Sequence, residues 1–385
     1  MRICLVSSSF YPANFYGGPI SATWNFSSYM AKKDIDIYVS TTNANGSTRL
    51  NVDTNRFIKK QDNFFVKYYN EQFINRLSLA FIFGIWNDIK KADLVYIQYI
   101  FHYTVLFALL FSILQSKQIV ICPRGSFSKF TLSYSIPFVK SMWLRLCIRP
   151  FGKYIRWHAS SYLEERDIKR NLSGARVEII NDGVDFLTFQ KFIVYDKQAL
   201  LEKYTNCQFK DISSIFLSMG RLHEIKCFDV LIDAFSIFIR NDKDAKLIIA
   251  GADDGMFEKL NRQIINLKLQ DSVFLIGFVG FEDKKILLNN CDYFTLASEF
   301  ESFGIAIVEA LSCGKPIVLS NKTPWKSLEK NKCGILVDND KISFSNAFLK
   351  ITNEEYDSQL IKDYIKANYD WGIIADRFLA SINNE

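Results

Sequence analysis

The chain has 385 residues, of which 49% are hydrophobic and 15% aromatic, and its formal net charge at pH 7 is +6. This composition excludes an intrinsically disordered protein, and the length allows two domains of ordinary size with separate cores. The eight cysteines include no Cys-x-x-Cys pair and the three histidines are scattered along the chain. We therefore predict reduced thiols, a cytoplasmic location and no metal site.

The N-terminal half of the chain alternates apolar, strand-like runs with helical stretches, which predicts a doubly wound α/β domain with a parallel sheet. The chain enters its first run without a charged segment followed by an apolar signal, so secretion is not indicated. Residues 103–114 are very apolar. They fall short of the ~20 residues that span a bilayer, so we predict a buried helix there. The strand-like runs are residues 2–7, 35–40, 64–68, 94–97, 118–122 and 177–180.

A glycine pair follows the first predicted strand. Gly17 and Gly18 lie in a loop that leads into a helical pattern over residues 20–32. Glycine permits positive φ angles and a close approach of the backbone to an anion. Because such a pair is most often only a turn, its position after the first strand is what makes it a candidate ligand contact.

Residues 124–156 combine seven cations with large apolar side chains and contain no acidic residue. Such a mixture suits an anionic membrane surface, and we predict that this segment meets the inner face of the cell membrane. A nucleic-acid surface is the competing interpretation, but no nucleic-acid fold signature accompanies it, so we predict no such partner. An ordinary helical insertion with solvated lysines is the other alternative. The cations are Arg124, Lys129, Lys140, Arg145, Arg149, Lys153 and Arg156.

Two cations follow a buried strand in the second half of the chain. The predicted strand 215–219 ends at Gly220, and Arg221 and Lys226 lie in the loop that leads to an amphipathic helix. Arginine offers a two-pronged donor to phosphate oxygens, and lysine offers a compact charge. At the carboxyl edge of a parallel sheet both would face a ligand crevice, although two loop cations are usually only solvated.

Two carboxylates bracket a Ser-Phe-Gly turn further along the chain. Glu301 precedes the turn, and Glu309 lies in the helix that follows it, between predicted strands 293–297 and 317–320. The start of this helix presents backbone amides that suit a phosphate. At the rise of an α-helix the two carboxylates would lie roughly 12 Å apart. This distance suits the binding of both ends of a long anion. A surface helix and a hydrolytic pair are the alternatives, but hydrolytic carboxylates lie about 5–9.5 Å apart.

The two motifs together resemble one enzyme family. Gly-Arg-Leu-x-x-x-Lys at residues 220–226, followed about 75 residues later by Glu-x₇-Glu with Phe-Gly inside it, is similar to the retaining glycosyltransferases of family 4. The resemblance covers most of the chain and implies the GT-B fold, in which two Rossmann-like, doubly wound parallel-sheet domains face a cleft. The expected domains are residues 1–188, against which a last helix within 369–385 packs, and residues 189–368. Strands of the second domain are expected at 215–219, 246–250, 273–276, 293–297, 317–320 and 335–337.

By this resemblance, Arg221, Lys226 and Glu301 are the expected catalytic residues. The two cations hold the donor diphosphate, Glu301 binds hydroxyls of the donor sugar, and Glu309 binds those of the ribose. The family commonly has glycine after the motif lysine, where this chain has Cys227. The other expected donor-binding residues are the amides of Ser302, Phe303 and Gly304, the nucleobase loop with Gly277 and Phe278, and Gly220, Gly17 and Gly18.

Two residues of the first domain are candidates for acceptor or phosphate contacts. Many relatives carry a histidine near the reacting sugar where this chain has Arg124. An arginine stays protonated and cannot act as a base, so a phosphate contact is expected of it instead. His102 is the second candidate in the same part of the chain.

The sequence thus predicts a glycosyltransferase that moves a hexose-type sugar from a nucleoside-diphosphate-sugar to a hydroxyl of a glycan acceptor, with retention implied by the resemblance. A polyprenyl-diphosphate-linked acceptor would account for the basic segment, and bacterial surface-polysaccharide synthesis (O-antigen, capsule or exopolysaccharide) is the expected pathway. No cofactor or metal is expected, because cations and helix amides supply the charge stabilisation. A nucleotide-sugar epimerase of similar fold and a non-catalytic partner subunit remain alternatives.

Overall fold

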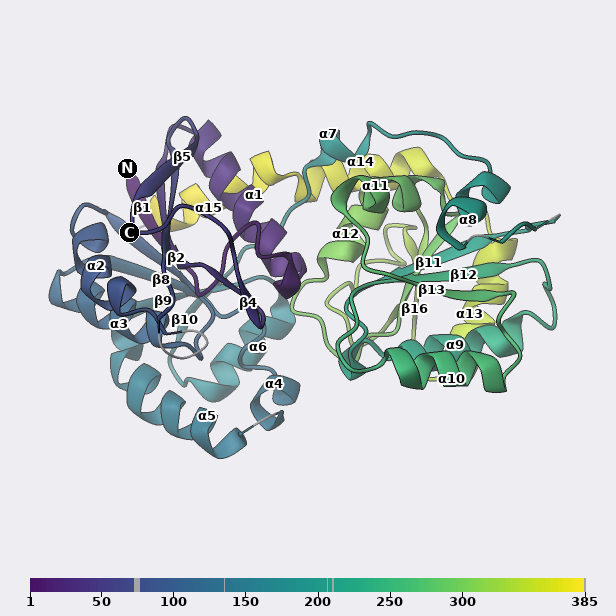
Figure 1. Cartoon of the computed structure of the whole chain (residues 1–385), viewed down its shortest axis with the longest axis horizontal. Coiled ribbons are helices and arrows are strands. Elements are labelled where there is room, and N and C mark those ends of the chain that lie inside the picture. Colours follow the sequence, from purple (N-terminus) through teal and green to yellow (C-terminus); the bar gives the residue numbers. More distant parts are fainter. Residues whose placement is uncertain (73–76, 135, 206, 210, 384–385) are drawn as a thin grey trace. The chain divides into compact units, whose positions relative to one another are not determined.

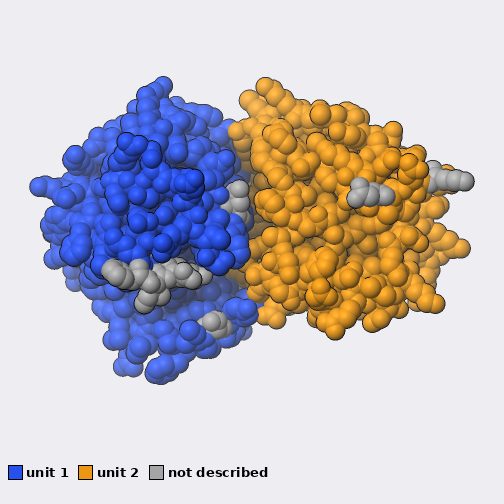
Figure 2. Space-filling model, in the orientation of Figure 1, with its two compact units in different colours: residues 1–183, 371–385 blue, residues 184–370 orange. Residues whose placement is uncertain are grey.

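The computed structural model describes residues 1–72, 77–134, 136–205, 207–209 and 211–383. The chain forms two compact units, which are residues 1–183 with 371–385 (unit 1) and residues 184–370 (unit 2) (Figures 1 and 2). The sequence places the boundaries at 188/189 and 368/369, so the two divisions differ by a few residues. The chain enters unit 2 at Val184 and leaves it after Asp370. These two ends of unit 2 pair with each other, because the Val184 amide donates to the Tyr369 carbonyl at 2.8 Å.

Unit 1 is built on an eight-stranded sheet with the order β10-β9-β8-β7-β1-β2-β6-β5. Its strands pair in parallel, except that β5 runs antiparallel to β6. The predicted doubly wound α/β domain is therefore confirmed. The strands are β1 Arg2–Val6, β2 Asp36–Thr42, β5 Phe57–Gln61, β6 Phe64–Tyr69, β7 Leu94–Gln98, β8 Gln118–Cys122, β9 Ile155–Ala159 and β10 Arg176–Ile179, beside a small pair, β3 Ala44–Asn45 and β4 Thr48–Arg49.

The sequence prediction missed β5 and β9. Strand β9 reads Ile-Arg-Trp-His-Ala, and its polar residues conceal the apolar run that marks the other inner strands. In the folded chain the polar side chains of β9 have hydrogen-bond partners. The buried His158 ring contacts the Tyr96 hydroxyl at 2.8 Å and the Ile180 carbonyl at 2.6 Å, and burial lowers the pKa of His158 to about 4. Strand β5 is an edge strand with exposed lysines, which gives no buried-strand pattern.

The last helix of the chain belongs to unit 1 and packs on its first helix (Figure 1). The Phe26 and Phe378 rings meet edge to face at 4.9 Å, and Lys33 pairs with Asp376 at 2.7 Å. The helices of unit 1 are α1 Gly18–Lys32, α2 Leu79–Lys90, α3 Tyr103–Leu114, α4 Lys129–Ser133, α5 Pro137–Trp143, α6 Tyr162–Asn171 and α15 Trp371–Asn383, with the short helices η1 Asn14–Tyr16, η2 Leu144–Ile148 and η3 Arg149–Tyr154.

Unit 2 contains an all-parallel sheet with the order β13-β12-β11-β14-β15-β16. This is the doubly wound order in which the chain starts in the middle, adds strands to one side and then returns to the other. All six strands predicted for this half are present, because each is a short buried run between turn residues. They are β11 Ile215–Met219, β12 Lys246–Ala250, β13 Val273–Gly277, β14 Tyr293–Leu296, β15 Ile317–Ser320 and β16 Gly334–Val337.

Helices cover both faces of this sheet (Figure 1). Helices α10 and α13 pack against α9, whereas α11 and α14 pack against α12. The helices of unit 2 are α7 Phe186–Phe189, α8 Lys197–Thr205, η4 Glu224–Lys226, α9 Phe228–Phe238, α10 Phe257–Asn266, α11 Phe281–Asn290, α12 Ile305–Ser312, α13 Lys341–Asn353 and α14 Ser358–Tyr369.

The apolar stretch 103–114 forms the single 12-residue helix α3, as predicted. Across the residues that the structure describes, none of the helices combines the length and apolar character needed to cross a bilayer.

Candidate active site

The motif residues of unit 2 meet where its strand order reverses. Strands β11 and β14 are neighbours in the sheet, but the chain proceeds from β11 outward to β13 before it returns to β14. Open α/β sheets bind ligands at the carboxyl edge of the sheet where the strand order reverses, so the loops after β11 and β14 are the expected place for a ligand. Arg221 and Lys226 follow β11, and Glu301 follows β14.

Backbone contacts fix the loop after β11. The Gly220 amide donates to the Ala250 carbonyl at 3.0 Å, and the Leu222 amide donates to the Ala252 carbonyl at 2.8 Å. A Cβ on Gly251 would lie 1.7 Å from the Gly220 carbonyl oxygen, so this close approach of two loops requires glycine. The same loop holds Arg221, whose guanidinium bonds Asp254 at 2.5 Å and is about half exposed.

Lys226 and Glu301 are in direct contact, although 75 residues separate them in the sequence. The Lys226 Nζ lies 2.5 Å from Glu301 Oε1, and both side chains are largely buried. The Ser298 hydroxyl donates to the same carboxylate oxygen at 2.7 Å. The Lys226 chain lies over Gly220, where an added Cβ would meet its Cε at 3.1 Å. The structure thus brings the cation and the carboxylate of the two motifs together at one point.

The turn after Glu301 leads into helix α12 through a glycine in the left-handed region. Gly304 has φ +92° and precedes the first helical residue, Ile305. The first amides of a helix lack partners within it, so this start presents N–H donors and the positive end of the helix dipole. The Phe303 side chain is buried in the core, and its carbonyl accepts from the Trp325 indole at 2.7 Å. Phe303 is therefore available to a ligand through its backbone rather than its ring.

Glu309 has a partner that the sequence analysis did not identify. Its Oε1 lies 2.5 Å from the Nζ of Lys284, and both side chains are largely buried. Lys284 lies in the first turns of α11, next to the aromatic rings of Phe189 and Phe281. The only sequence signal for it is its position in the helix after the predicted nucleobase loop, which is too weak to have selected it.

The predicted nucleobase loop follows β13. Gly277 has φ +73°, and its carbonyl accepts from the Gly251 amide at 2.8 Å, which ties this loop to the end of β12. Phe278 is an exposed aromatic side chain beside it. An exposed ring on a loop tied to the crevice is compatible with stacking on a base, and this role remains a prediction.

Cys227 occupies the position where the resembled family commonly has glycine, and its backbone explains the preference. It lies between η4 and α9 with φ 49° and ψ 42°, in the left-handed region. Burial raises the pKa of the thiol, so the side chain is neutral and adds no charge next to Lys226. The residue thus carries a backbone strain that glycine would not have.

Cys227→Gly is expected to raise the free energy of unfolding by about 0.5–1 kcal/mol. Glycine removes a left-handed penalty of roughly 1–2 kcal/mol but loses about 0.5–1 kcal/mol more backbone entropy on folding. Urea denaturation measures the difference. Cys227→Ala is the control, because it removes the thiol and keeps the strained Cβ, so no gain is expected from it. Equal stability of the two variants would show that the backbone conformation is not the cause.

Two residues of unit 1 that were predicted to contact a ligand, Gly17 and His102, follow neighbouring strands of its sheet. These strands are β1 and β7, between which the strand order of this sheet reverses. Gly17 follows β1 with φ +71° and precedes α1, which begins at Gly18. An added Cβ on Gly17 would meet nothing within 4 Å, so the loop is open there. His102 follows β7 and caps α3, because its Nδ1 accepts from the Thr104 amide at 3.4 Å. This cap gives His102 a structural role.

The structure does not favour the predicted ligand role of Arg124. Its side chain is only 3% exposed, and Nη1 contacts both carboxylate oxygens of Asp182 at 2.5 Å. Both residues belong to unit 1, so this pairing does not depend on the position of unit 2. A guanidinium that is buried and already bonded to a carboxylate holds the fold of this edge rather than an anionic ligand.

Two acidic clusters of unit 2 cap helices. Asp253 accepts from the amides of Gly255, Met256 and Phe257 at the start of α10. These bonds, led by that from Phe257, lower the pKa of its carboxyl. Asp340 accepts from the amides of Ile342 and Ser343 at the start of α13. In the described part of the chain, no three His, Cys, Asp or Glu side chains are grouped as metal ligands would be. The expectation of a metal-free reaction remains a prediction.

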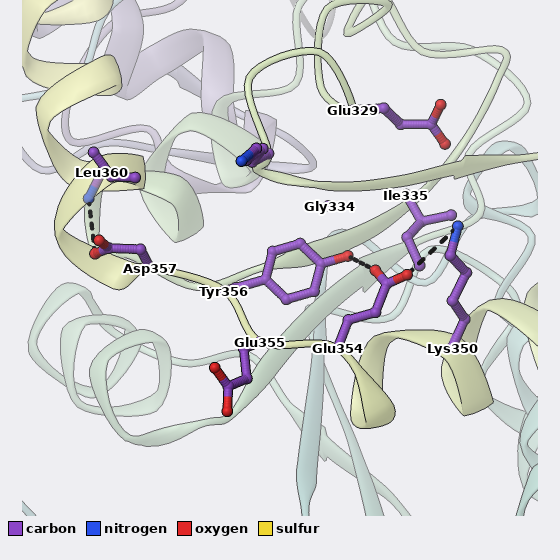
Figure 3. A pocket seen from close by; sticks show the side chains of 10 residues that line it. Glu329, Gly334, Ile335, Lys350, Glu354, Glu355, Tyr356, Asp357 and Leu360 are labelled. Atoms are coloured by element: carbon purple, nitrogen blue, oxygen red, sulfur yellow. Dashed lines mark hydrogen bonds and ion pairs between the residues drawn. The ribbon is translucent and has the colours of Figure 1, made fainter.

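A pocket elsewhere in unit 2 also contains several carboxylates (Figure 3). It lies between the end of α13 and the start of α14, and the predicted donor-binding residues do not line it within the described structure. Glu354 accepts from the Tyr356 hydroxyl at 2.8 Å and pairs with Lys350 at 3.7 Å. Asp357 caps α14 by accepting from the Leu360 amide at 3.1 Å. Glu354 thus binds Tyr356 and Lys350, and Asp357 serves a helix start, so these contacts give the groups a structural role.

The comparisons with known proteins place unit 2 among glycosyltransferase domains. Residues 207–371, which are most of unit 2, match the family model described as glycosyl transferases group 1. This match lies in the C-terminal unit and, together with the glycosyltransferase relatives, it supports the predicted glycosyltransferase class.

Curated relatives agree with this family. The chain is 33% identical over 113 residues to mannosylfructose-phosphate synthase of Agrobacterium fabrum, a match that covers 28% of this chain and 25% of that protein. It is 26% identical over 306 residues to the GDP-mannose:cellobiosyl-diphosphopolyprenol alpha-mannosyltransferase of Xanthomonas campestris, covering 77% of this chain and 75% of the relative. The first relative is thus matched over only a quarter of its length.

A solved structure shows the same fold over the whole chain. The Anabaena protein HepE, determined in complex with UDP-glucose, superposes with a TM-score of 0.77 and covers 100% of both chains at 18% sequence identity. At this identity the likeness establishes the fold alone. The prediction of two Rossmann-like α/β domains of the GT-B type is confirmed.

Proposed function

We propose that this protein transfers a hexose-type sugar from a nucleoside-diphosphate-sugar to a hydroxyl of a glycan acceptor, with retention of the anomeric configuration. The observation that carries the proposal is the contact between Lys226 and Glu301 at 2.5 Å, at the carboxyl edge of the unit 2 sheet. One partner comes from the loop after β11 and the other from the loop after β14, so the two motifs form a single site.

The charges in this site match the parts of such a donor. Arg221 and Lys226 supply positive charge for the diphosphate, and the start of α12 adds amide donors in the same crevice. Glu301 and Glu309 supply acceptors for hydroxyl groups on the two sides of the diphosphate. Each carboxylate is held by a lysine, Lys226 or Lys284, which keeps it in a defined orientation. In this proposal Arg221 and Lys226 bind the diphosphate, and Glu301 and Glu309 bind the hydroxyl groups on its two sides.

The proposed chemical step is departure of the nucleoside diphosphate as its bond to the anomeric carbon breaks. The acceptor hydroxyl forms a new bond to that carbon, and its proton passes to the departing diphosphate oxygen, which has gained the electron pair of the broken bond. Negative charge then develops on the diphosphate oxygen that leaves. In this proposal Lys226, Arg221 and the α12 amides donate to that oxygen, and donors held in place before the reaction stabilise the transition state more than the ground state.

The proposed acceptor is linked to a polyprenyl diphosphate, and the proposed place of reaction is the inner face of the cell membrane. The name of the Xanthomonas relative specifies a diphosphopolyprenol acceptor, and HepE was solved with UDP-glucose. These names support a lipid-linked acceptor and a nucleotide-sugar donor for this chain. A role in surface-polysaccharide synthesis follows as part of the same proposal.

Thermal unfolding with UDP, GDP, ADP and their common sugar conjugates tests the proposal. A ligand at 100 times its Kd stabilises the folded state by ~2.7 kcal/mol, which is a readily measured shift. One nucleotide class is expected to raise the melting temperature, and Arg221→Ala is expected to reduce that shift. Absence of a shift with every nucleotide would contradict a donor site at this crevice. Product analysis with the identified donor then separates transfer from epimerisation, which needs no acceptor.

A further inference from the structure

The helical segment formed by α5 and η2, residues 137–148, is apolar on two opposite faces. Its inner face packs into unit 1 through Trp143, Leu144 and Ile148. Four other apolar side chains repeat at helical spacing on the outer face and are exposed by 46–78%. Helices at the surface of a globular protein usually carry polar residues there. The outer-face residues are Phe138, Val139, Met142 and Leu146.

Neighbouring residues extend this apolar surface. Ile136, directly before α5, is 64% exposed, and Tyr134 and Tyr154 are about half exposed. Helices α4 and α5 lie side by side in unit 1 (Figure 1). We call the exposed side chains of residues 134, 136, 138, 139, 142, 146 and 154 the apolar ridge. Exposed apolar surface of this extent marks an interaction site rather than scattered single residues.

Cations accompany the apolar ridge, and the structure separates those that can act at a surface from those that cannot. Arg124 is buried with Asp182, Arg156 pairs with Glu178 at 3.0 Å, and the Lys140 Nζ lies 2.6 Å from the Thr131 carbonyl. The remaining cations of the predicted basic segment are exposed. They are Lys129, Arg145, Arg149 and Lys153.

We propose that the apolar ridge inserts into the interfacial region of an anionic lipid bilayer, with Lys129, Arg145, Arg149 and Lys153 at the level of the headgroups. This inference deepens the proposed function, because it rests on a membrane-bound acceptor and names the surface that reaches it. The charge pattern favours a bilayer over a protein partner. Residues 124–156 contain no carboxylate, and an anionic headgroup layer offers charge to every cation around the apolar ridge.

The length of the segment fits lying on a bilayer rather than crossing it. Twelve helical residues, about 18 Å at 1.5 Å per residue, are too short to span a hydrocarbon core of about 30 Å. An interfacial helix instead buries one face about 5–10 Å deep. Phe138, Met142 and Leu146 follow one another at intervals of four residues and therefore line one side of the helix.

Cosedimentation of the full chain with vesicles tests the proposal. We expect binding to vesicles that contain 30% phosphatidylglycerol, weaker binding to pure phosphatidylcholine, and further weakening at high salt. The double variant F138S/L146S is expected to bind the anionic vesicles at least about tenfold more weakly, since each exposed apolar side chain contributes through its burial. The matched control is F83S, because Phe83 on α2 is 77% exposed, like Phe138 at 78%, but lies outside the apolar ridge.

A variant with two cations removed tests the proposed contact with anionic headgroups. R145Q/K153Q is expected to reduce affinity for anionic vesicles about tenfold or more and to leave binding to phosphatidylcholine nearly unchanged. If F138S/L146S binds as tightly as F83S, the ridge is not the membrane contact and the proposal is wrong. Loss of a dimer by F138S/L146S in size-exclusion chromatography, without a change in vesicle binding, would likewise overturn it in favour of a protein interface.

Nucleotide binding, followed by the melting-temperature shift, separates this proposal from the function on which it rests. Vesicle binding that is lost in F138S/L146S with an unchanged nucleotide shift supports the ridge and the integrity of unit 2. A wild-type chain that binds nucleotide but not anionic vesicles overturns the ridge proposal and leaves the transferase site standing. A chain that binds the vesicles through the ridge but no nucleotide contradicts the donor site alone.

Discussion

Lys226→Ala is expected to reduce the rate of sugar transfer by about 10²–10³-fold without unfolding the protein. Lys226 is the buried cation of the crevice and contacts Glu301 at 2.5 Å. In the proposed mechanism its charge acts where negative charge develops on the leaving diphosphate, so its removal should affect the transition state more than donor binding. The turnover number kcat should therefore fall, and KM for the donor should change less. Steady-state rates of nucleotide release with the donor found by thermal unfolding measure both.

Glu301→Ala should produce a loss of similar size, because it removes the proposed sugar contact and leaves Lys226 without its partner. Lys259→Ala is the matched control, since Lys259 is a lysine of the same unit that pairs with Asp229 at 2.9 Å on an exposed surface. Rates near wild type are expected for it. If Lys226→Ala and Glu301→Ala also turned over at rates near wild type, the active site would have to lie elsewhere.

Asp182→Ala is expected to lower the free energy of unfolding by about 3–5 kcal/mol, the usual cost of removing one partner of a buried ion pair. Asp182 binds Arg124, whose side chain is only 3% exposed. Without the carboxylate, the guanidinium would remain buried with no opposite charge, and burial of an unpaired charge is costly. Urea denaturation measured at constant m value reports the change.

Asp376→Ala provides the control for this prediction. Asp376 forms an ion pair of similar length with Lys33, at 2.7 Å, but on an exposed surface. Such pairs contribute no more than about 1 kcal/mol. Equal losses for Asp182→Ala and Asp376→Ala would show that the Arg124 pair is not buried as described. The double variant Arg124→Met/Asp182→Leu should recover most of the stability, and retained transfer activity in it would establish Arg124 as a structural residue.

The strands of unit 2 could be predicted because each one is a local feature. A buried parallel strand is a short apolar run between turn residues, and all six runs appear at the predicted places. The missed strand β9 shows the limit of this signal. His158 and Arg156 make it look polar, and only partners from other strands and from α15 satisfy them. Their burial depends on contacts that no local pattern contains.

The candidate site residues divide in the same way. Arg221, Lys226, Glu301 and Glu309 stand out by their spacing in two motifs, so the sequence alone selects them and the glycosyltransferase class. Lys284 has no motif, and only the packing of α11 near α12 shows that it holds Glu309. The resemblance alone indicates that the family prefers glycine at the position of Cys227. The reason for the preference, the left-handed φ of this residue, is a property of the folded backbone.

The sequence alone determined the alternation of strands and helices, the two motifs and the glycosyltransferase class, because these depend on residue type and spacing within short windows. Tertiary structure decided which charges meet. It joined Lys226 to Glu301, buried Arg124 against Asp182, and left Phe138 and Leu146 exposed in a segment with exposed cations. The two partners lie 25 residues apart for Lys284 and Glu309, 75 for Lys226 and Glu301, and 58 for Arg124 and Asp182, so only the folded chain fixes these pairs.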